Sequence, residues 1–168
     1  AGGAAGGAAY RKWIRDFAAG LGGRRSIVVL EADAVPQTPK MSATAREERF
    51  DLLRDAIHVL KAANAIVYLD AGNARWMTPD AAAAALRNAG LDEADGFSLN
   101  VSNYISTPVT TAYGEQISKR TGGKPFIIDR SGKGMGGTPD AQWSTPPGQS
   151  LGTEPTTETN HTLVDALL

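Results

Sequence analysis

Residues 26–30 read SIVVL, a continuous apolar run rich in β-branched side chains. Such a run is typical of a strand in a parallel sheet that is buried on both faces. Four comparable runs follow, and they predict strands at residues 65–69 (AIVYL), 96–100 (GFSLN), 126–129 (FIID) and 163–168 (LVDALL). Successive strands start roughly 30 residues apart, which is the repeat of a strand–helix–strand unit.

Between these strands the apolar residues recur at helical spacing. The predicted helices are residues 10–21, 43–63, 79–88 and 109–121. Alternating strands and helices predict an α/β fold with a parallel sheet. Because a closed eight-unit barrel needs about 250 residues, the pattern is compatible either with a smaller open sheet or with part of a barrel.

The composition is that of one globular domain over residues 1–168, in which the AGGAAGGAA stretch at residues 1–9 is expected to be a flexible arm. The net charge is −1 and the basic residues are scattered. This argues against a nucleic acid or a membrane surface as partner, because both attract clustered basic residues.

The absence of cysteine excludes a disulfide, a thiolate zinc site and a cysteine nucleophile. No apolar run approaches the roughly 18 residues of a membrane span, and no signal peptide is visible in the sequence.

Polar side chains lie at, or just after, the carboxyl ends of four predicted strands. They are Glu31 and Asp33, Asp70, Asn100 with Asn103, and Asp129. The carboxyl ends of parallel strands converge on one rim, where α/β proteins bind their ligands. Each residue alone is also common in caps and turns, but their repetition favours a shared binding site. Such oxygen-rich rims suit a polyhydroxylated ligand or a hard cation. A cation requires tightly clustered carboxylates, whereas these lie on separate strands, so we expect no metal and no cofactor.

Tryptophans in loops give a second indication, because the apolar face of a sugar ring packs on an indole. Trp76 follows the second strand and Trp143 lies in the long loop after the fourth. Both are candidate stacking surfaces, while Trp13 lies in the first predicted helix and is expected in the core. The glycine-rich segment 131–137 (SGKGMGG) offers an alternative, a phosphate-binding loop, although it lacks the residue order of that motif.

Several motifs, taken in order, resemble glycoside hydrolase family 6. They are VLEADA (29–34), VYLDAGNARW (67–76), ADGFSLNVSNY (94–104), FIID (126–129), WSTPPGQSLGTEPTT (143–157) and LVDALL (163–168). The resemblance implies that the sheet forms part of a distorted (β/α) barrel of the glycoside hydrolase family 6 type. It also implies a secreted cellulase, most often an endoglucanase, that hydrolyses β-1,4-glucan or cello-oligosaccharide with inversion.

Inverting hydrolysis uses an acidic and a basic carboxyl group that lie about 6.5–9.5 Å apart. The resemblance implies that the general acid and the base belong to motifs flanking this segment, and that Asp33 is a supporting carboxylate. It further implies sugar contacts at Asn73, Trp76, Asn103 and Trp143.

The departures from the family pattern fall in loops of the active face. Ala32 replaces the proline of its E-P-D motif, Asn73 stands where a histidine is expected, and Gln149 stands where an arginine is usual. We therefore weigh three functions: an endoglucanase completed by adjoining sequence, a non-catalytic glucan-binding remnant, and a phosphate- or nucleotide-binding domain. A barrel that is truncated at both ends also has unpaired sheet edges. Self-association, or pairing with a complementing fragment, is accordingly expected.

Overall fold

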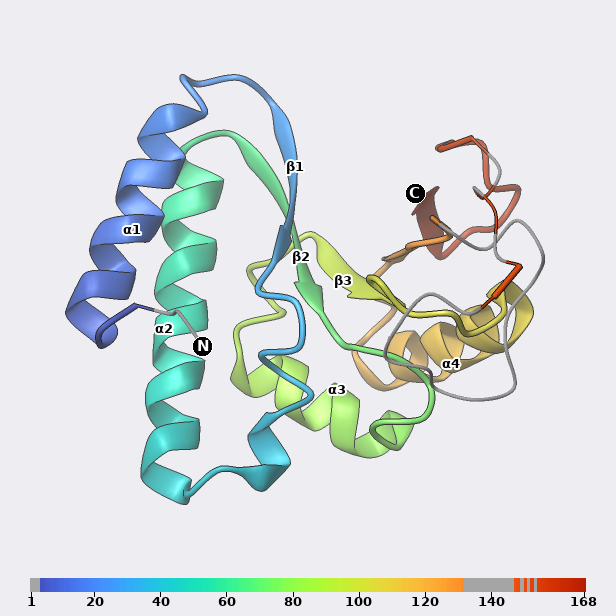
Figure 1. Ribbon diagram of the computed structural model, residues 1–168, viewed down its shortest axis with the longest axis horizontal. Helices are drawn as coiled ribbons and strands as arrows, with labels where there is room; N and C mark the ends of the chain where they lie inside the picture. The colour runs from blue at the N-terminus through green and yellow to red at the C-terminus, as the bar shows by residue number, and fades with distance from the viewer. Residues whose placement is uncertain (1–3, 132–146, 149, 151, 153) are drawn as a thin grey trace.

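The computed structural model describes residues 4–131, 147, 148, 150, 152 and 154–168. Five strands form one sheet in the order β1-β2-β3-β4-β5, and each neighbouring pair is parallel (Figure 1). The strands are β1 (Ser26–Leu30), β2 (Ala65–Asp70), β3 (Gly96–Leu99), β4 (Phe126–Ile128) and β5 (Val164–Leu167). The predicted α/β fold and all five predicted strands are therefore confirmed.

The helices also lie where the sequence predicts them, with small shifts at their ends. They are α1 (Gly7–Gly20), α2 (Ala43–Ala62), α3 (Pro79–Asn88) and α4 (Thr107–Arg120), with a short 3-10 turn at Thr38–Lys40. Ser42 caps α2 and Thr78 caps α3, each accepting a backbone N–H three residues later.

The start of α1 corrects one expectation, because residues 7–9 of the predicted flexible arm are helical. A side chain at Gly7 would lie 3.2 Å from Oε1 of Glu48 and 3.5 Å from a methyl carbon of Leu52. The absence of a side chain thus lets α1 approach α2 closely, and this tertiary contact outweighs the low helix propensity of glycine.

The four helices cover one face of the sheet. Their buried side chains join alternate strand residues in one large apolar cluster, to which α1 contributes Ile14, α2 Leu53, α3 Leu86 and α4 Ile117. The opposite face has a small separate cluster of Tyr68, Ile127 and Ala166. Helices on one face of a curled parallel sheet are the arrangement of a barrel wall, not of a doubly wound sheet.

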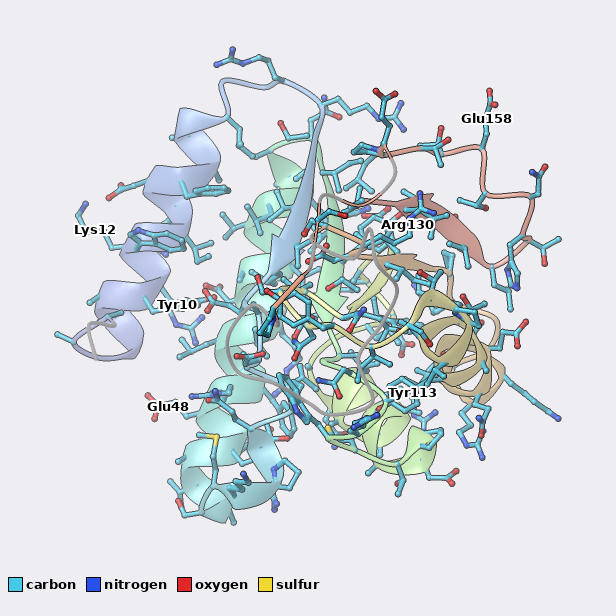
Figure 2. The ribbon with its side chains drawn as sticks, turned by 45° about the vertical axis from the view of Figure 1, so that its right-hand side comes forward. Tyr10, Lys12, Glu48, Tyr113, Arg130 and Glu158 are labelled. Atoms are coloured by element: carbon cyan, nitrogen blue, oxygen red, sulfur yellow. The ribbon has the colours of Figure 1, made fainter. Side chains whose placement is uncertain are left out.

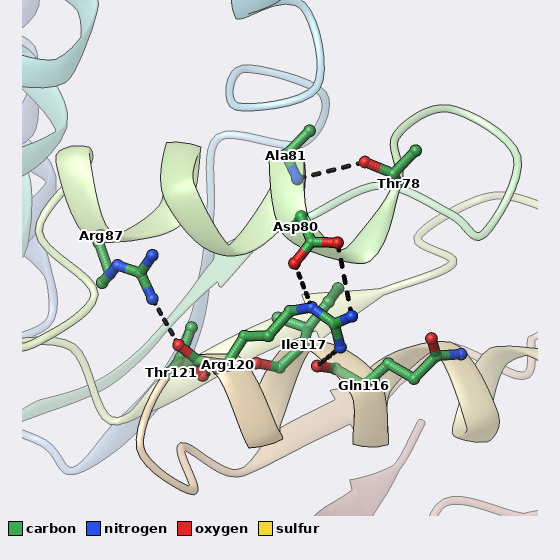
Figure 3. Close-up of polar contacts among 8 residues, drawn as sticks. All are labelled: Thr78, Asp80, Ala81, Arg87, Gln116, Ile117, Arg120 and Thr121. Atoms are coloured by element: carbon green, nitrogen blue, oxygen red, sulfur yellow. Dashed lines mark hydrogen bonds and ion pairs between the residues drawn. The ribbon is translucent and has the colours of Figure 1, made fainter.

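Polar contacts tie α3 to α4 (Figure 3). Nε of Arg120 donates to a carboxylate oxygen of Asp80 at 2.6 Å, and the Arg87 guanidinium donates to the backbone carbonyl of Arg120. These contacts join Asp80 at the start of α3 and Arg87 near its end to Arg120, the last residue of α4.

Two side chains expected in the interior are exposed. Ile27 of β1 is 52% exposed, so β1 is not buried on both faces, because no described strand lies beyond it and the face without helices is open there. Trp13 is 55% exposed and stacks between Tyr10 and Phe17 along α1, with ring centroids 6.4 and 5.6 Å apart. The core side of α1 is formed by Ile14 and Ala18 instead. In the described part of the chain, no helix combines the length and the apolar character required to cross a membrane.

Candidate functional site

The ends of β1 and β2 bring two aspartates together. The backbone N–H of Asp33, in the loop after β1, donates to Oδ2 of Asp70 at 2.8 Å. Asp70 ends β2 and is 1% exposed, whereas Asp33 is only half-buried. Among the described residues, no donor reaches the carboxylate oxygens of Asp33. Asp33 is thus the acid of this pair that can face a ligand.

Asp70 is a buried carboxylate surrounded by donors. The N–H of Gly72 donates to its Oδ2 at 3.2 Å, and the Ser98 hydroxyl donates to its Oδ1 at 3.3 Å. Burial most of all, and then the negative charge of Asp33, raise the pKa of Asp70, while the three donors lower it; the net shift is from 3.8 to about 6. Asp70 therefore ties the ends of β1, β2 and β3 together, but offers no free oxygen to solvent.

The loop after β2 presents Trp76. Gly72 has a φ of 71°, and a side chain there would lie 2.6 Å from Cε3 of Trp76 and 2.7 Å from Cγ of Pro36. Only glycine satisfies both the left-handed backbone and the close approach. The indole is thus backed by the loop while remaining 37% exposed. This is the geometry of a platform on which a flat apolar surface can stack.

Asn73 connects this loop to the end of β3. Its side chain is 0% exposed, and its Nδ2 donates to Oδ1 of Asn103 at 3.1 Å. Its own Oδ1 accepts the N–H of Arg75 at 2.9 Å in an Asx turn. Asn103 is partly exposed and is further held by donation to the carbonyl of Val101 at 2.7 Å. Asn73 therefore orients Asn103 from beneath the rim, and Asn103 carries the accessible amide.

The remaining rim residues shape the loops. Asn100 is fully buried and pairs with Ile105 through both side-chain atoms, at 2.8 and 3.2 Å, while its N–H donates to the carbonyl of Gly72 at 2.7 Å. Asp129 accepts the N–H of Ser102 at 2.7 Å. These two residues have the turn-forming role that Asn and Asp often take.

The structure brings together those predicted rim residues that it describes. Asp33, Trp76 and Asn103 lie on connected loops, joined through Asp70, Gly72 and Asn73. Trp143, Gln149 and all of the segment 131–137 except Ser131 lie outside the described residues. In the described ranges, no group of three or more His, Asp or Glu side chains is arranged to hold a metal ion.

Sequence reasoning missed the part played by Gly72 and Ser98 in building this rim. A signal for Gly72 was present, since a glycine that closely follows a strand often marks a turn or a close backbone approach. Ser98 gave no such signal, because a serine inside a strand is not distinctive.

Comparison with known sequences gives one consistent result. The family model described as "Glycosyl hydrolases family 6" matches residues 1–168. Endoglucanase 1 of Streptomyces halstedii is 41% identical over 160 residues, which make up 91% of this chain and 49% of that protein. Endoglucanase A of Cellulomonas fimi is 40% identical over 159 residues, or 95% of this chain and 34% of that protein. The chain thus spans half or less of the length of these relatives.

Solved structures agree with the sequence comparisons. The endoglucanase Cel6 from Mycobacterium tuberculosis, solved in complex with methyl-cellobiosyl-4-deoxy-4-thio-β-D-cellobioside, superposes with a TM-score of 0.93 at 44% identity, covering 100% of this chain and 58% of that chain. Endoglucanase CEL6B from Humicola insolens has a TM-score of 0.82 at 25% identity, over 97% of this chain and 58% of that chain. The folded sheet, its rim and these matches together place the chain in glycosyl hydrolase family 6.

Proposed function

We propose that the protein hydrolyses β-1,4-glucosidic bonds of cellulose or soluble β-glucan with inversion, as an endoglucanase. The observation that carries this proposal is the single hydrogen-bonded rim on which Asp33, Trp76 and Asn103 lie, in a chain of this family. Its similarity to endoglucanases, one of them solved with a thio-linked cello-oligosaccharide, supports the choice of substrate. Because such a substrate is a polymer found outside cells, we also propose an extracellular site of action.

For Asp33 we propose the supporting role that the resemblance implies. Its side chain is half-buried, and its carboxylate receives no hydrogen bond from the described residues. Of the Asp33–Asp70 pair, Asp33 is therefore the carboxylate that can reach a bound sugar. We propose that it helps to order the sugar and the general acid, which the resemblance assigns to a flanking motif.

Asp70 does not fit the role of the base. Its side chain is 1% exposed, and its two oxygens accept from Asp33, Gly72 and Ser98. An inverting base needs an accessible oxygen for a water molecule and a separation of about 6.5–9.5 Å from the acid. Asp70 therefore serves as a buried support for Asp33, and the proposal assigns no base among the described residues.

The proposal gives Trp76 the stacking role and Asn103 a hydrogen bond to a sugar hydroxyl, with Asn73 acting only through Asn103. The protein is expected to lower the viscosity of carboxymethylcellulose faster than it releases reducing ends, the signature of cleavage inside chains.

Trp76→Ala is expected to weaken cello-oligosaccharide binding about tenfold, since tryptophans that become buried on binding contribute a large share of many binding free energies. Titration followed by intrinsic fluorescence or calorimetry measures this loss.

Trp13→Ala is the matched control, because Trp13 is an exposed tryptophan on α1 and not on the rim. Its affinity for cello-oligosaccharide should equal that of the parent protein. Binding without any hydrolysis would instead support the non-catalytic glucan-binding alternative, which the replacements at Ala32 and Asn73 favour. Binding of nucleotides in place of sugars would support the phosphate-loop alternative.

We also propose self-association through β1 and not through β5. The outer edge of β5 is covered by an antiparallel bridge between Thr156 and Leu167, whereas no described strand pairs with the outer edge of β1. An open edge with an exposed apolar residue such as Ile27 favours pairing with a second copy or a complementing fragment. Light scattering on residues 1–168 should give a mass above 17.6 kDa. Ile27→Lys should reduce it to that of a monomer, and an unaltered oligomer would place the contact elsewhere.

A further inference from the structure

The loop that carries Asp33 has an unfavourable backbone. Glu31 has a φ of 51° and Asp33 a φ of 69°, so two non-glycine residues adopt the left-handed region within one turn. Such conformations persist only where surrounding contacts enforce them, and they concentrate at functional sites. The loop therefore needs anchors, and each anchor contributes to the position of the Asp33 carboxylate.

Two anchors are formed by side chains from neighbouring elements. Asp70 of β2 accepts the N–H of Asp33 at 2.8 Å. Arg49 of α2 donates to the carbonyl of Ala34 and to Oε1 of Gln37, both at 3.2 Å. These contacts hold the middle and the far end of the turn. Neither of them holds the side chain of Glu31, with which the turn begins.

Tyr10 of α1 lies against that side chain. Figure 2 shows Tyr10 pointing from α1 toward α2, whereas Lys12 points away from both. Tyr10, Glu31 and Arg49 line one open cavity of about 430 Å³ on the side of the rim next to α1 and α2. The hydroxyl oxygen of Tyr10 is buried and has no hydrogen-bond partner among the described residues. Burial raises the pKa of Tyr10, and the adjacent Glu31 carboxylate raises it further, so the phenol stays protonated as a donor.

We propose that Tyr10 is a positioning residue, whose hydroxyl donates to Glu31 and thereby fixes the left-handed loop that presents Asp33 to the substrate. This inference rests on the proposed glucanase activity. A buried hydroxyl without a hydrogen bond is costly in free energy, and donating to the adjacent carboxylate removes that cost. The open cavity gives the Glu31 side chain an alternative position in water. Without the Tyr10 phenol, the Glu31 side chain would turn toward this cavity. The first residue of the turn would then lose its anchor.

The result of such a loss is a displaced Asp33 carboxylate and not a lost contact of Trp76 or Asn103 with the sugar. Trp76 and Asn103 belong to the loops after β2 and β3, which Tyr10 does not contact through any hydrogen bond in the described ranges. Substrate affinity is therefore expected to survive while the chemical step slows, because a small misplacement of a catalytic group lowers the rate of that step.

Tyr10→Phe removes the hydroxyl alone and tests the inference. In the protein, kcat on carboxymethylcellulose is expected to fall about tenfold while KM changes less than about twofold. Glu31→Met, which removes the acceptor, should lower kcat by a similar factor. The double variant Tyr10→Phe with Glu31→Met should be no slower than either single variant, because both changes break the same contact. Glu31→Gln retains an oxygen acceptor and should recover most of the rate.

Tyr68→Phe is the matched control, since it also removes one buried phenol hydroxyl, which donates to Asp165 at 2.6 Å between β2 and β5. It should lower the melting temperature without changing kcat per folded molecule. An unchanged kcat in Tyr10→Phe, or independent effects of Tyr10→Phe and Glu31→Met that multiply in the double variant, would overturn the inference while leaving the glucanase intact. An inactive parent protein would overturn both.

Discussion

Asp33→Asn is expected to lower kcat on carboxymethylcellulose by about 100-fold, because a catalytic site whose groups are slightly misplaced can lose a rate factor of that size. The substitution retains the shape of the side chain and leaves the backbone N–H of Asp33 free to donate to Asp70, a contact of 2.8 Å. Folding should therefore be nearly unchanged, and the melting curve of the variant should overlay that of the parent protein. Only the negative charge of the side chain is lost.

The leaving group distinguishes a supporting carboxylate from a proton donor. A dinitrophenyl cellobioside releases a phenolate that needs no protonation, so the loss of a proton donor would spare activity on that substrate. As a supporting carboxylate, Asp33 should be needed on both substrates, and Asp33→Asn should lower both activities by similar factors. Retained activity on the dinitrophenyl substrate alone would instead make Asp33 the proton donor. Asp16→Asn is the matched control, since Asp16 is an exposed carboxylate of α1 that pairs with Lys12 at 2.6 Å. It should be fully active on both substrates.

The strands, the helices and the common rim could be predicted because their signals are local. A run such as SIVVL or AIVYL identifies a strand without knowledge of its neighbours. The direction of a parallel strand then determines at which rim Asp33 or Asp70 must lie. The family resemblance added the expectation of a barrel to this pattern.

The exposure of particular side chains could not be predicted, because it depends on what covers each face. Trp13 and Ile14 are adjacent residues of the same apolar stripe, yet Ile14 is 1% exposed and Trp13 is 55% exposed. The rotation of α1 against α2 makes this difference, and that rotation is fixed by contacts such as the 2.9 Å ion pair between Arg11 and Asp55. Likewise, Ile27 is exposed only because β1 lies at the edge of the described sheet.

The support beneath the candidate site was equally hidden in the sequence. Asn73 was expected to contact sugar, and it stays a predicted binding residue, but its buried amide can act only through Asn103. The proposed hydrogen bond of Tyr10 to Glu31 would join two elements, and it follows from no spacing rule. Supporting contacts of this kind depend on tertiary packing, whereas the rim residues follow from strand direction alone.

Asp70 is expected to make the folded protein less stable as the pH rises from about 4 to about 6. Burial, followed by repulsion from Asp33, raises the pKa of Asp70 from 3.8 to about 6 in the folded state. In this interval the unfolded chain releases the proton while the native protein keeps it, so raising the pH favours the unfolded state. Below about pH 4 both states are protonated and the penalty vanishes. Above about pH 6 the penalty is complete and amounts to about 3 kcal/mol.

Two substitutions separate the charge of Asp70 from its hydrogen bonds. In Asp70→Asn, the amide oxygen can accept from Asp33 and Gly72 while the amide nitrogen donates to the Ser98 hydroxyl, which replaces all three contacts without a charge. Its free energy of unfolding should rise by up to about 3 kcal/mol at pH 7, and its pH dependence between 4 and 6 should flatten. Asp70→Ala leaves three donors without an acceptor and should lower the free energy of unfolding by about 3 kcal/mol or more.

Urea unfolding of the parent protein and both variants at pH 4, 5, 6 and 7 measures these differences. If Asp70→Asn retained the slope of the parent protein, another group would be responsible for it. If Asp70→Ala were as stable as Asp70→Asn, the hydrogen bonds to Asp33, Gly72 and Ser98 would contribute little. We expect Asp70→Asn to be more stable but less active than the parent protein. A buried charge that opposes folding is generally retained only where it supports a functional site, here that of Asp33. The measured kcat of Asp70→Asn therefore decides whether the carboxylate acts on Asp33 through its charge or only through the backbone contact that the amide preserves.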